Sequence, residues 1–147
     1  MLADKPESGQ RPQRIEEVRT MNTTARGLLL IDPNPLERQR LAEALENRGW
    51  KVWSVSDGPT AYELYRERPH EIHTALVDLQ FPGLEGSRIL AELGRIAPAL
   101  FRCAMSGEVS EYTAAAFRRL TDTPLFPKPV KVEHLDAAMR DPAASAC

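Results

Sequence analysis

The stretch ALVDLQFPGLEG, residues 75–86, decides the fold, because an apolar run ends at Asp78 and gives way to a loop with a proline and glycines. A short apolar run bounded by turn residues is typical of a strand buried on both faces of a parallel sheet. In open α/β sheets, ligands bind beyond the carboxyl ends of the strands. We therefore expect Asp78 to lie at the functional edge of such a sheet.

Three further polar residues, Asp32, Ser106 and Lys128, come directly after short apolar runs. These runs are residues 28–31, 100–105 and 125–127. Each predicted strand end is separated from the next by room for a helix and a return strand. Because the carboxyl ends of parallel strands meet at one edge of a sheet, we expect all three side chains to converge on Asp78.

From residue 27 onward, apolar strands alternate with amphipathic helices. The expected strands are residues 28–32, 51–55, 73–78, 100–106 and 125–126. Asn34 is a good N-cap for the first helix, and residues 56–59 begin the second. The alternation predicts an α/β fold, a doubly wound (βα)5 three-layer sandwich with a five-stranded parallel sheet. Prolines on both sides of residues 125–126 favour an edge position for the last strand.

Composition and charge exclude several classes of protein. The chain has a formal net charge of -2 with scattered lysines and arginines, so the basic stripe of a nucleic-acid-binding protein is missing. No stretch approaches the roughly 20 apolar residues of a membrane span, and the N-terminus lacks the apolar centre of a signal peptide. We expect a cytoplasmic protein with neither nucleic acid nor membrane as a partner. Cys103 lies inside an apolar run and is expected to pack in the core.

The 147 residues suit one domain with a tail at each end. Residues 1–26 mix charges of both signs with two prolines and offer little to bury, so we expect a disordered tail. Met21 is an alternative start of the protein, in which case the first twenty residues would not be translated. Residues 27–140 carry the alternating pattern and form the predicted domain, and residues 141–147 form a C-terminal tail.

The residues at the strand ends resemble those of a known family, the response-regulator receiver domain of two-component signalling, with the chemotaxis regulators as the nearest type. The resemblance covers residues 28–139 and rests on Asp78 with Pro82, Gly83 and Gly86, on Ser106-Gly107, and on Lys128-Pro129. It implies a flavodoxin-like fold. It also implies that Asp78 accepts a phosphoryl group from a phosphohistidine on a sensor histidine kinase or a phosphotransfer protein, which makes the chain a phosphoprotein.

The chemistry of an aspartyl phosphate explains why these residue types occur together. A carboxylate attacks a phosphoryl group only when the phosphoryl oxygens are neutralised and donor and acceptor are in line. Lys128 supplies a positive charge and Ser106 a hydroxyl donor, and a divalent ion held by carboxylates would bridge the rest. Hard oxygen ligands favour Mg²⁺. The resemblance assigns Asp32, Asp78 and the main-chain carbonyl of Gln80 to this metal and implies a cis peptide bond after Lys128.

One departure from the family pattern concerns the metal. Receivers usually carry two successive acids at the end of the first strand, and the second acid touches the metal, whereas here Asp32 is followed by Pro33. Loss of a negative ligand should weaken the binding of Mg²⁺, which gives up its waters reluctantly. Asn34 or Glu108 is expected to compensate in part, and Glu108 is also expected, with Gln80, to tune hydrolysis from the rim of the site.

A second departure concerns switching, because Leu125 stands where the family usually has an aromatic side chain that swings inward. A leucine cannot make the same hydrogen-bonded switch. Any signal is therefore expected to pass through the loop after Ser106 and the following helix as a population shift.

Each residue also has a purely structural interpretation. Asp78 alone would cap its loop, Asp32 would begin a turn and a helix, and Lys128 would be an ordinary surface lysine. The agreement of Asp78, Ser106 and Lys128 favours a phosphoacceptor site over these readings. Charged residues of the last two helices would either face solvent, which is favoured, or form contacts across a homodimer. These are Arg118, Arg119, Glu133 and Asp136.

Three classes of function remain open. The first is a stand-alone receiver of a phosphorelay, which is not an enzyme and signals by protein contact. The second is a degenerate receiver that binds partners regardless of phosphorylation, which Pro33 and Leu125 favour. The third, an enzyme or cofactor binder, ranks last because residues 33–37 form no phosphate-binding nest and Gln80 replaces the second acid of an aspartyl phosphatase. We predict the first class.

Overall fold

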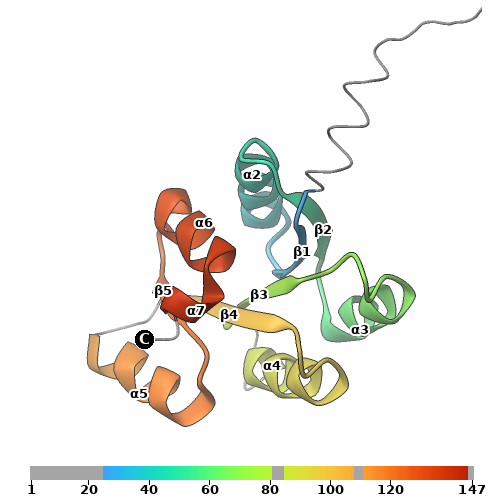
Figure 1. The fold of residues 1–147 in the computed structure, drawn as a ribbon. Helices are drawn as coiled ribbons and strands as arrows, with labels where there is room; N and C mark the ends of the chain where they lie inside the picture. The colour runs from blue at the N-terminus through green and yellow to red at the C-terminus, as the bar shows by residue number, and fades with distance from the viewer. Residues whose placement is uncertain (1–24, 81–84, 108–110, 146–147) are drawn as a thin grey trace, which may run out of the picture.

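The computed structural model describes residues 25–80, 85–107 and 111–145, which form a parallel sheet with helices on both faces (Figure 1). The 5-stranded sheet has the order β2-β1-β3-β4-β5, which confirms the predicted doubly wound sandwich. The strands are β1 (Gly27–Ile31), β2 (Lys51–Val55), β3 (Thr74–Asp78), β4 (Phe101–Ser106) and β5 (Leu125–Pro127). The helices are α2 (Pro35–Glu46), α3 (Gly58–Glu67), α4 (Glu85–Ile96), α5 (Glu111–Thr121), α6 (Val132–Arg140) and α7 (Pro142–Ser145).

Two apolar layers hold the helices to the sheet, and the pleat of β1 contributes to both. Leu28 and Leu30 pack toward α2 and α6, whereas Leu29 and Ile31 pack toward α3 and α4. Successive side chains of a strand point to opposite faces, so an uninterrupted apolar run is what a central strand of this sheet requires. All five residues of β1 and of β3 are buried. Burial of both strands fixes the positions of the residues at their carboxyl ends.

The start of α2 is built by the N-cap that the sequence predicts. Asn34 Oδ1 accepts hydrogen bonds from the backbone N–H groups of Leu36 and Glu37, both at 3.0 Å, and Pro35 occupies the first turn. A cap of this kind satisfies donors that have no partner inside the helix. The backbone N–H of Asn34 in turn donates to Asp32 Oδ1 at 2.8 Å. The first turn of α2 is thereby fixed beside the end of β1.

The edges of the sheet agree with the sequence. Strand β5 is an outer strand, as the prolines at positions 124 and 127 predict, and β2 is the outer strand at the opposite edge. Trp50 is 3% exposed and packs in the layer under α2 and α6, and Cys103 is fully buried in the same layer. Burial raises the pKa of the Cys103 thiol, as expected for a cysteine that serves as core packing.

The prediction for Asp136 was wrong. Its side chain does not face solvent or a second copy, because it is buried and accepts hydrogen bonds from three donors. These are Trp50 Nε1 at 2.7 Å, Arg140 Nε at 2.8 Å and Arg48 Nε at 3.0 Å. A buried carboxylate needs such partners, and the indole N–H at the start of β2 supplies one that helix periodicity cannot reveal. Arg118, Arg119 and Glu133 are exposed.

The two predicted tails have different outcomes. Residues 1–24 lie outside the described part of the chain, so the expected disorder and the alternative start at Met21 stay predictions. The segment predicted as a C-terminal tail contains the short helix α7, which contacts α6. Within the described residues, no helix is both long enough and apolar enough to cross a bilayer.

Candidate functional site

Four strand ends meet at one edge of the sheet, as the sequence predicts. Asp32 follows β1, Asp78 ends β3, Ser106 ends β4 and Lys128 follows β5. The register of the ladder pairs Asp78 with Met105 and Ser106 with Pro127, so neighbouring strands end at nearly the same level. The peptide bond between Lys128 and Pro129 is cis, as the resemblance implies.

Asp78 is fixed from two sides. It is 1% exposed, and its Oδ1 accepts a hydrogen bond from the Gln80 backbone N–H at 2.9 Å. Its Oδ2 accepts from Lys128 Nζ at 2.6 Å. A charge-assisted bond of this length holds the carboxylate in one orientation. Asp78 is thus a buried, pre-positioned carboxylate whose negative charge is already paired with a lysine.

Lys128 reaches the site from the segment after β5 and pairs with more than one acid. Its Nζ donates to Asp78 and, at 2.9 Å, to Glu37 Oε1, with the Gln80 Oε1 oxygen at 3.4 Å. The side chain is 16% exposed. Burial works to lower the pKa of Lys128, but the bonds to Asp78 and Glu37 outweigh it, so the pKa is raised. The ammonium therefore stays charged at neutral pH.

Asp32 is the least satisfied acid of the site. It is 1% exposed, and its Oδ1 accepts from the Asn34 backbone N–H. Among the described residues, Asp32 Oδ2 is the buried side-chain nitrogen or oxygen that has no hydrogen-bond partner. Burial raises the pKa of Asp32 to about 6, against the lowering effect of the Asn34 bond, and the negative charge of Asp78 adds to the rise. A buried carboxylate oxygen without a hydrogen-bond partner is stabilised by binding a cation or a proton.

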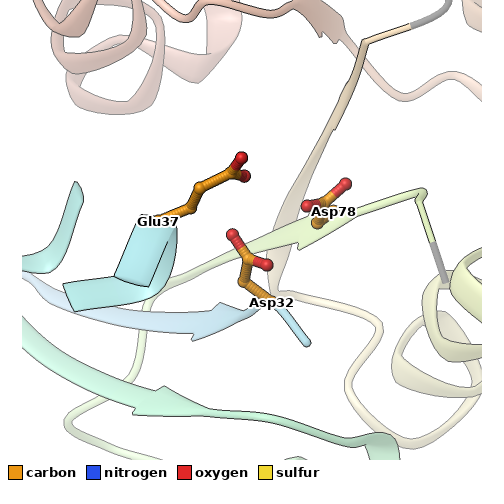
Figure 2. Close-up of side chains that lie close together, drawn as sticks. All are labelled: Asp32, Glu37 and Asp78. Atoms are coloured by element: carbon orange, nitrogen blue, oxygen red, sulfur yellow. The ribbon is translucent and has the colours of Figure 1, made fainter. Parts of the chain in front are cut away.

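Glu37 is the site residue that the sequence interpretation missed. One carboxylate oxygen each of Asp32, Glu37 and Asp78 lies within 4.8 Å of the others, and Figure 2 shows the three side chains gathered above the ends of β1 and β3. Glu37 occupies the first turn of α2, three residues after its N-cap. The sequence feature that could have identified Glu37 is an acid in the first turn of the helix that follows Asp32.

The two residues expected to compensate for Pro33 have different outcomes. The Asn34 side-chain oxygen accepts two backbone N–H bonds of α2 and serves as the helix cap. Glu108 lies outside the described residues. Gln80, expected at the rim, is exposed, and its backbone N–H supports Asp78.

The donor set fits a hard divalent cation. Mg²⁺ prefers oxygen ligands, usually one or two carboxylates with several waters. The site offers carboxylates from Asp32, Asp78 and Glu37. Among the described residues, Asp32 Oδ2 has no hydrogen-bond partner, so it is available to bind a cation. The residues present therefore fit Mg²⁺, although the family's usual second acid is replaced by Pro33.

A cavity of about 570 Å³ opens beside the acids and runs between α2 and the segment that leads into α6. Asp32, Glu37 and Lys128 line its polar end, and Leu41 and Val132 are among the apolar residues farther along. Gly107 belongs to the rim, where a β-carbon would come within 2.9 Å of Gln80 Nε2. The cavity thus opens the site to the outside at Asp32, Glu37 and Lys128, whereas Asp78 does not line it.

The chain belongs to the response regulator receiver domain family, whose family model matches residues 28–140. It is therefore a receiver domain of two-component signalling, related both to response regulators and to receiver domains of sensor kinases. A response regulator receiver protein of Anaeromyxobacter sp. (strain Fw109-5) is 31% identical over 110 residues, which are 75% of this chain and 45% of that protein. The sensor kinase CckA of Brucella abortus (strain 2308) is 23% identical over 139 residues, 95% of this chain and 15% of that protein.

Solved structures agree on the fold. The signal receiver domain of an HD domain-containing protein from Pseudomonas fluorescens Pf-5 matches with a TM-score of 0.70 at 20% identity, over 84% of this chain and 98% of that chain. A receiver domain protein from Clostridium thermocellum matches with a TM-score of 0.70 at 23% identity, over 79% and 92%. This chain spans less than half the length of the two curated relatives named above, so their whole-protein activities belong to them.

Proposed function

We propose that the chain accepts a phosphoryl group on Asp78 from a phosphohistidine of a sensor histidine kinase or a phosphotransfer protein. The observation that carries the proposal is the placement of Asp78, buried and held between the Gln80 N–H and Lys128 Nζ at the open edge of the sheet. A nucleophile held in one orientation removes much of the entropic barrier to an in-line transfer. The relatives in sensor kinases and response regulators support this class of donor.

The proposed transfer needs few groups. A carboxylate oxygen of Asp78 forms a bond to phosphorus while the phosphorus–nitrogen bond of the donor breaks, and the electron pair leaves with the imidazole. Lys128 Nζ, 2.6 Å from Asp78 Oδ2, neutralises charge on the phosphoryl oxygens, and the Ser106 hydroxyl donates to another. Mg²⁺ held by Asp32, Asp78 and the Gln80 main-chain carbonyl would add positive charge at the same oxygens.

The consequence of phosphorylation is proposed to be a change in protein contacts. Leu125 is 8% exposed and packs in the layer under α3, α4 and α5, where Phe117 is half-buried. An aliphatic side chain in this place supports a shift of the α5 region without an aromatic switch. The stand-alone organisation, the homodimer and the cytoplasmic location stay predictions.

The alternative is a degenerate receiver that binds partners regardless of phosphorylation. Pro33 favours it, because the family's second metal-binding acid is missing. A metal site weakened in this way would slow or abolish phosphoryl transfer. The two functions differ in one measurable property, the covalent modification of Asp78.

The test is the intact mass of the protein after incubation with acetyl phosphate, with and without Mg²⁺. We expect a metal-dependent gain of one phosphoryl group in the native chain and none in Asp78→Asn. Asp57→Asn is the matched control, because it makes the same chemical change at a half-buried N-cap of α3, where asparagine caps equally well. No gain in the native chain, under conditions that modify a control receiver, would favour the degenerate receiver.

A further inference from the structure

We infer that Glu37 supplies, from the first turn of α2, the metal-binding carboxylate that Pro33 cannot supply, so that a divalent cation is held by Asp32, Asp78 and Glu37. The inference deepens the proposed function, because it concerns the cation of the same site. It assigns a role to a residue five positions beyond Asp32, outside the strand-end pair on which the resemblance rests.

The loop between β1 and α2 cannot provide the missing acid from its own residues. Pro33 has no ligand atom in its side chain, and Asn34 uses its side-chain oxygen to cap α2 at 3.0 Å from two backbone nitrogens. Removing that oxygen from the cap would leave the first donors of the helix unpaired. The next residue with a carboxylate is Glu37, in the first turn of the helix.

The geometry brings the Glu37 carboxylate close to those of Asp32 and Asp78. Its carboxylate shares with Asp32 and Asp78 a set of oxygens that lie within 4.8 Å of one another. Two oxygens on opposite sides of a bound Mg²⁺ are about 4.1 Å apart, since each bond is about 2.0–2.1 Å long. A small rotation of Glu37, or one bridging water, covers the difference, and its side chain is 50% exposed and free of core packing.

An independent observation points to a cation rather than to a group of solvated acids. Asp32 Oδ2 is buried and lacks a hydrogen-bond partner among the described residues, and Figure 2 shows the Asp32 carboxylate grouped with those of Glu37 and Asp78. A buried, unpaired oxygen of this kind is costly unless something positive fills the space in front of it. Because the Asp32 carboxylate belongs to the acidic triad, a cation that pairs with this oxygen would lie close to Glu37 and Asp78.

The charges around the triad leave room for a dication. Lys128 Nζ bonds to Asp78 and Glu37, and the Arg38 guanidinium donates to the main-chain oxygen of Asp32 at 2.7 Å. Lys128 therefore pairs with two of the three carboxylates. Arg38 donates to the main-chain oxygen of Asp32 in this bond and not to its carboxylate. A cation that draws Glu37 toward Asp32 would release Lys128 from one of its two acids and leave it to face a phosphoryl group.

The test measures the affinity of the full chain for Mg²⁺ by isothermal titration calorimetry. We expect Glu37→Gln to weaken binding by about tenfold or more, because it removes a charged ligand and keeps the side-chain shape. Glu46→Gln makes the same change at an exposed position of α2 and should stay within about twofold of the native chain. Equal affinities for the native chain and Glu37→Gln, or no Mg²⁺ binding by the native chain, would overturn the inference.

A double-mutant cycle separates a ligand from a residue that acts through Lys128. In a Lys128→Met background, Glu37→Gln should still weaken Mg²⁺ binding by about tenfold, since a ligand does not need the lysine. If the effect disappears in that background, Glu37 acts by positioning Lys128 and is not a ligand. Circular dichroism of each variant verifies that the affinity is measured on folded protein.

The two proposals can fail separately. Mg²⁺ binding that depends on Glu37, in a chain that gains no phosphoryl group, would retain the cation site and remove the phosphoacceptor function. A metal-dependent gain of a phosphoryl group that Glu37→Gln leaves unchanged, with unchanged Mg²⁺ affinity, would retain the function and overturn the role of Glu37.

Discussion

Two buried carboxylates of this molecule, Asp136 and Asp32, differ in how fully they are hydrogen-bonded. Asp136 is 7% exposed and accepts hydrogen bonds from Trp50, Arg48 and Arg140. Burial works to raise the pKa of Asp136, but these three donors outweigh it and lower the pKa below its usual value. Asp32 is 1% exposed, has one backbone donor and a pKa raised to about 6.

The difference separates a carboxylate that holds the fold together from one that awaits a partner. Asp136 joins α6 to the end of α2 and the start of β2, and Arg140 also stacks over the Trp50 ring at 5.3 Å. Its charge is neutralised inside the protein. Asp32 lies at the open edge of the sheet with one oxygen unpaired. Buried acids left in this condition mark functional sites, where stability is given up for binding.

The largest expected effect comes from breaking the satisfied carboxylate. Asp136→Ala should destabilise the protein by about 3 kcal/mol, because it leaves the buried Trp50 N–H and two guanidinium groups without their acceptor. Urea denaturation at pH 7 measures the change. Glu133→Ala, an exposed acid on the same helix, is the control and should change stability by less than about 0.5 kcal/mol. Equal effects of the two substitutions would mean that the Asp136 cluster contributes little.

Relieving the unsatisfied carboxylate should have the opposite sign. In the presence of EDTA at pH 8, Asp32→Asn should stabilise the protein by about 2 kcal/mol, because it removes a buried charge and keeps the bond from the Asn34 N–H. The same substitution should weaken the proposed metal site, because it removes the charge of one of its carboxylate ligands. Urea denaturation measures the stability, and destabilisation by Asp32→Asn at pH 8 would contradict the comparison.

The pH dependence of this effect has a definite sign. The folded-state pKa of Asp32 is raised from 3.8 to about 6, so the folded protein binds this proton more tightly than the unfolded chain does. Stability is therefore lost as the pH rises from 3.8 through about 6, and the full penalty applies above that value. The advantage of Asp32→Asn should shrink as the pH is lowered from 8 to 4.5. Asp136 behaves in the opposite way, since its lowered pKa stabilises the protein above pH 3.8 and that contribution is lost in stronger acid.

The acids of this molecule also show which contacts can be predicted from the sequence and which cannot. Asp32, Asp78 and Lys128 could be placed together because strand ends of a parallel sheet share one edge, and the runs before them mark those strands. Asp136 and Glu37 could not, because their roles depend on side chains that are distant in sequence. The Trp50 N–H is 86 residues from Asp136, and Lys128 is 91 residues from Glu37. Periodicity gives the face of a helix but not the partner opposite it.

The smallest expected effect sharpens the comparison at the functional site. Without divalent cations, Glu37→Gln should destabilise the protein by about 0.5 kcal/mol or less, although it removes an ion pair of 2.9 Å with Lys128. The Glu37 side chain is 50% exposed, so water replaces the lost contact, and Lys128 keeps Asp78. Thermal unfolding in EDTA measures the change, with Glu46→Gln as the control for the lost charge. A loss as large as that of Asp136→Ala would mean that Glu37 is part of the structural framework, whereas a small loss is what a side chain reserved for a cation should show, because its interaction free energy is realised only when that cation binds.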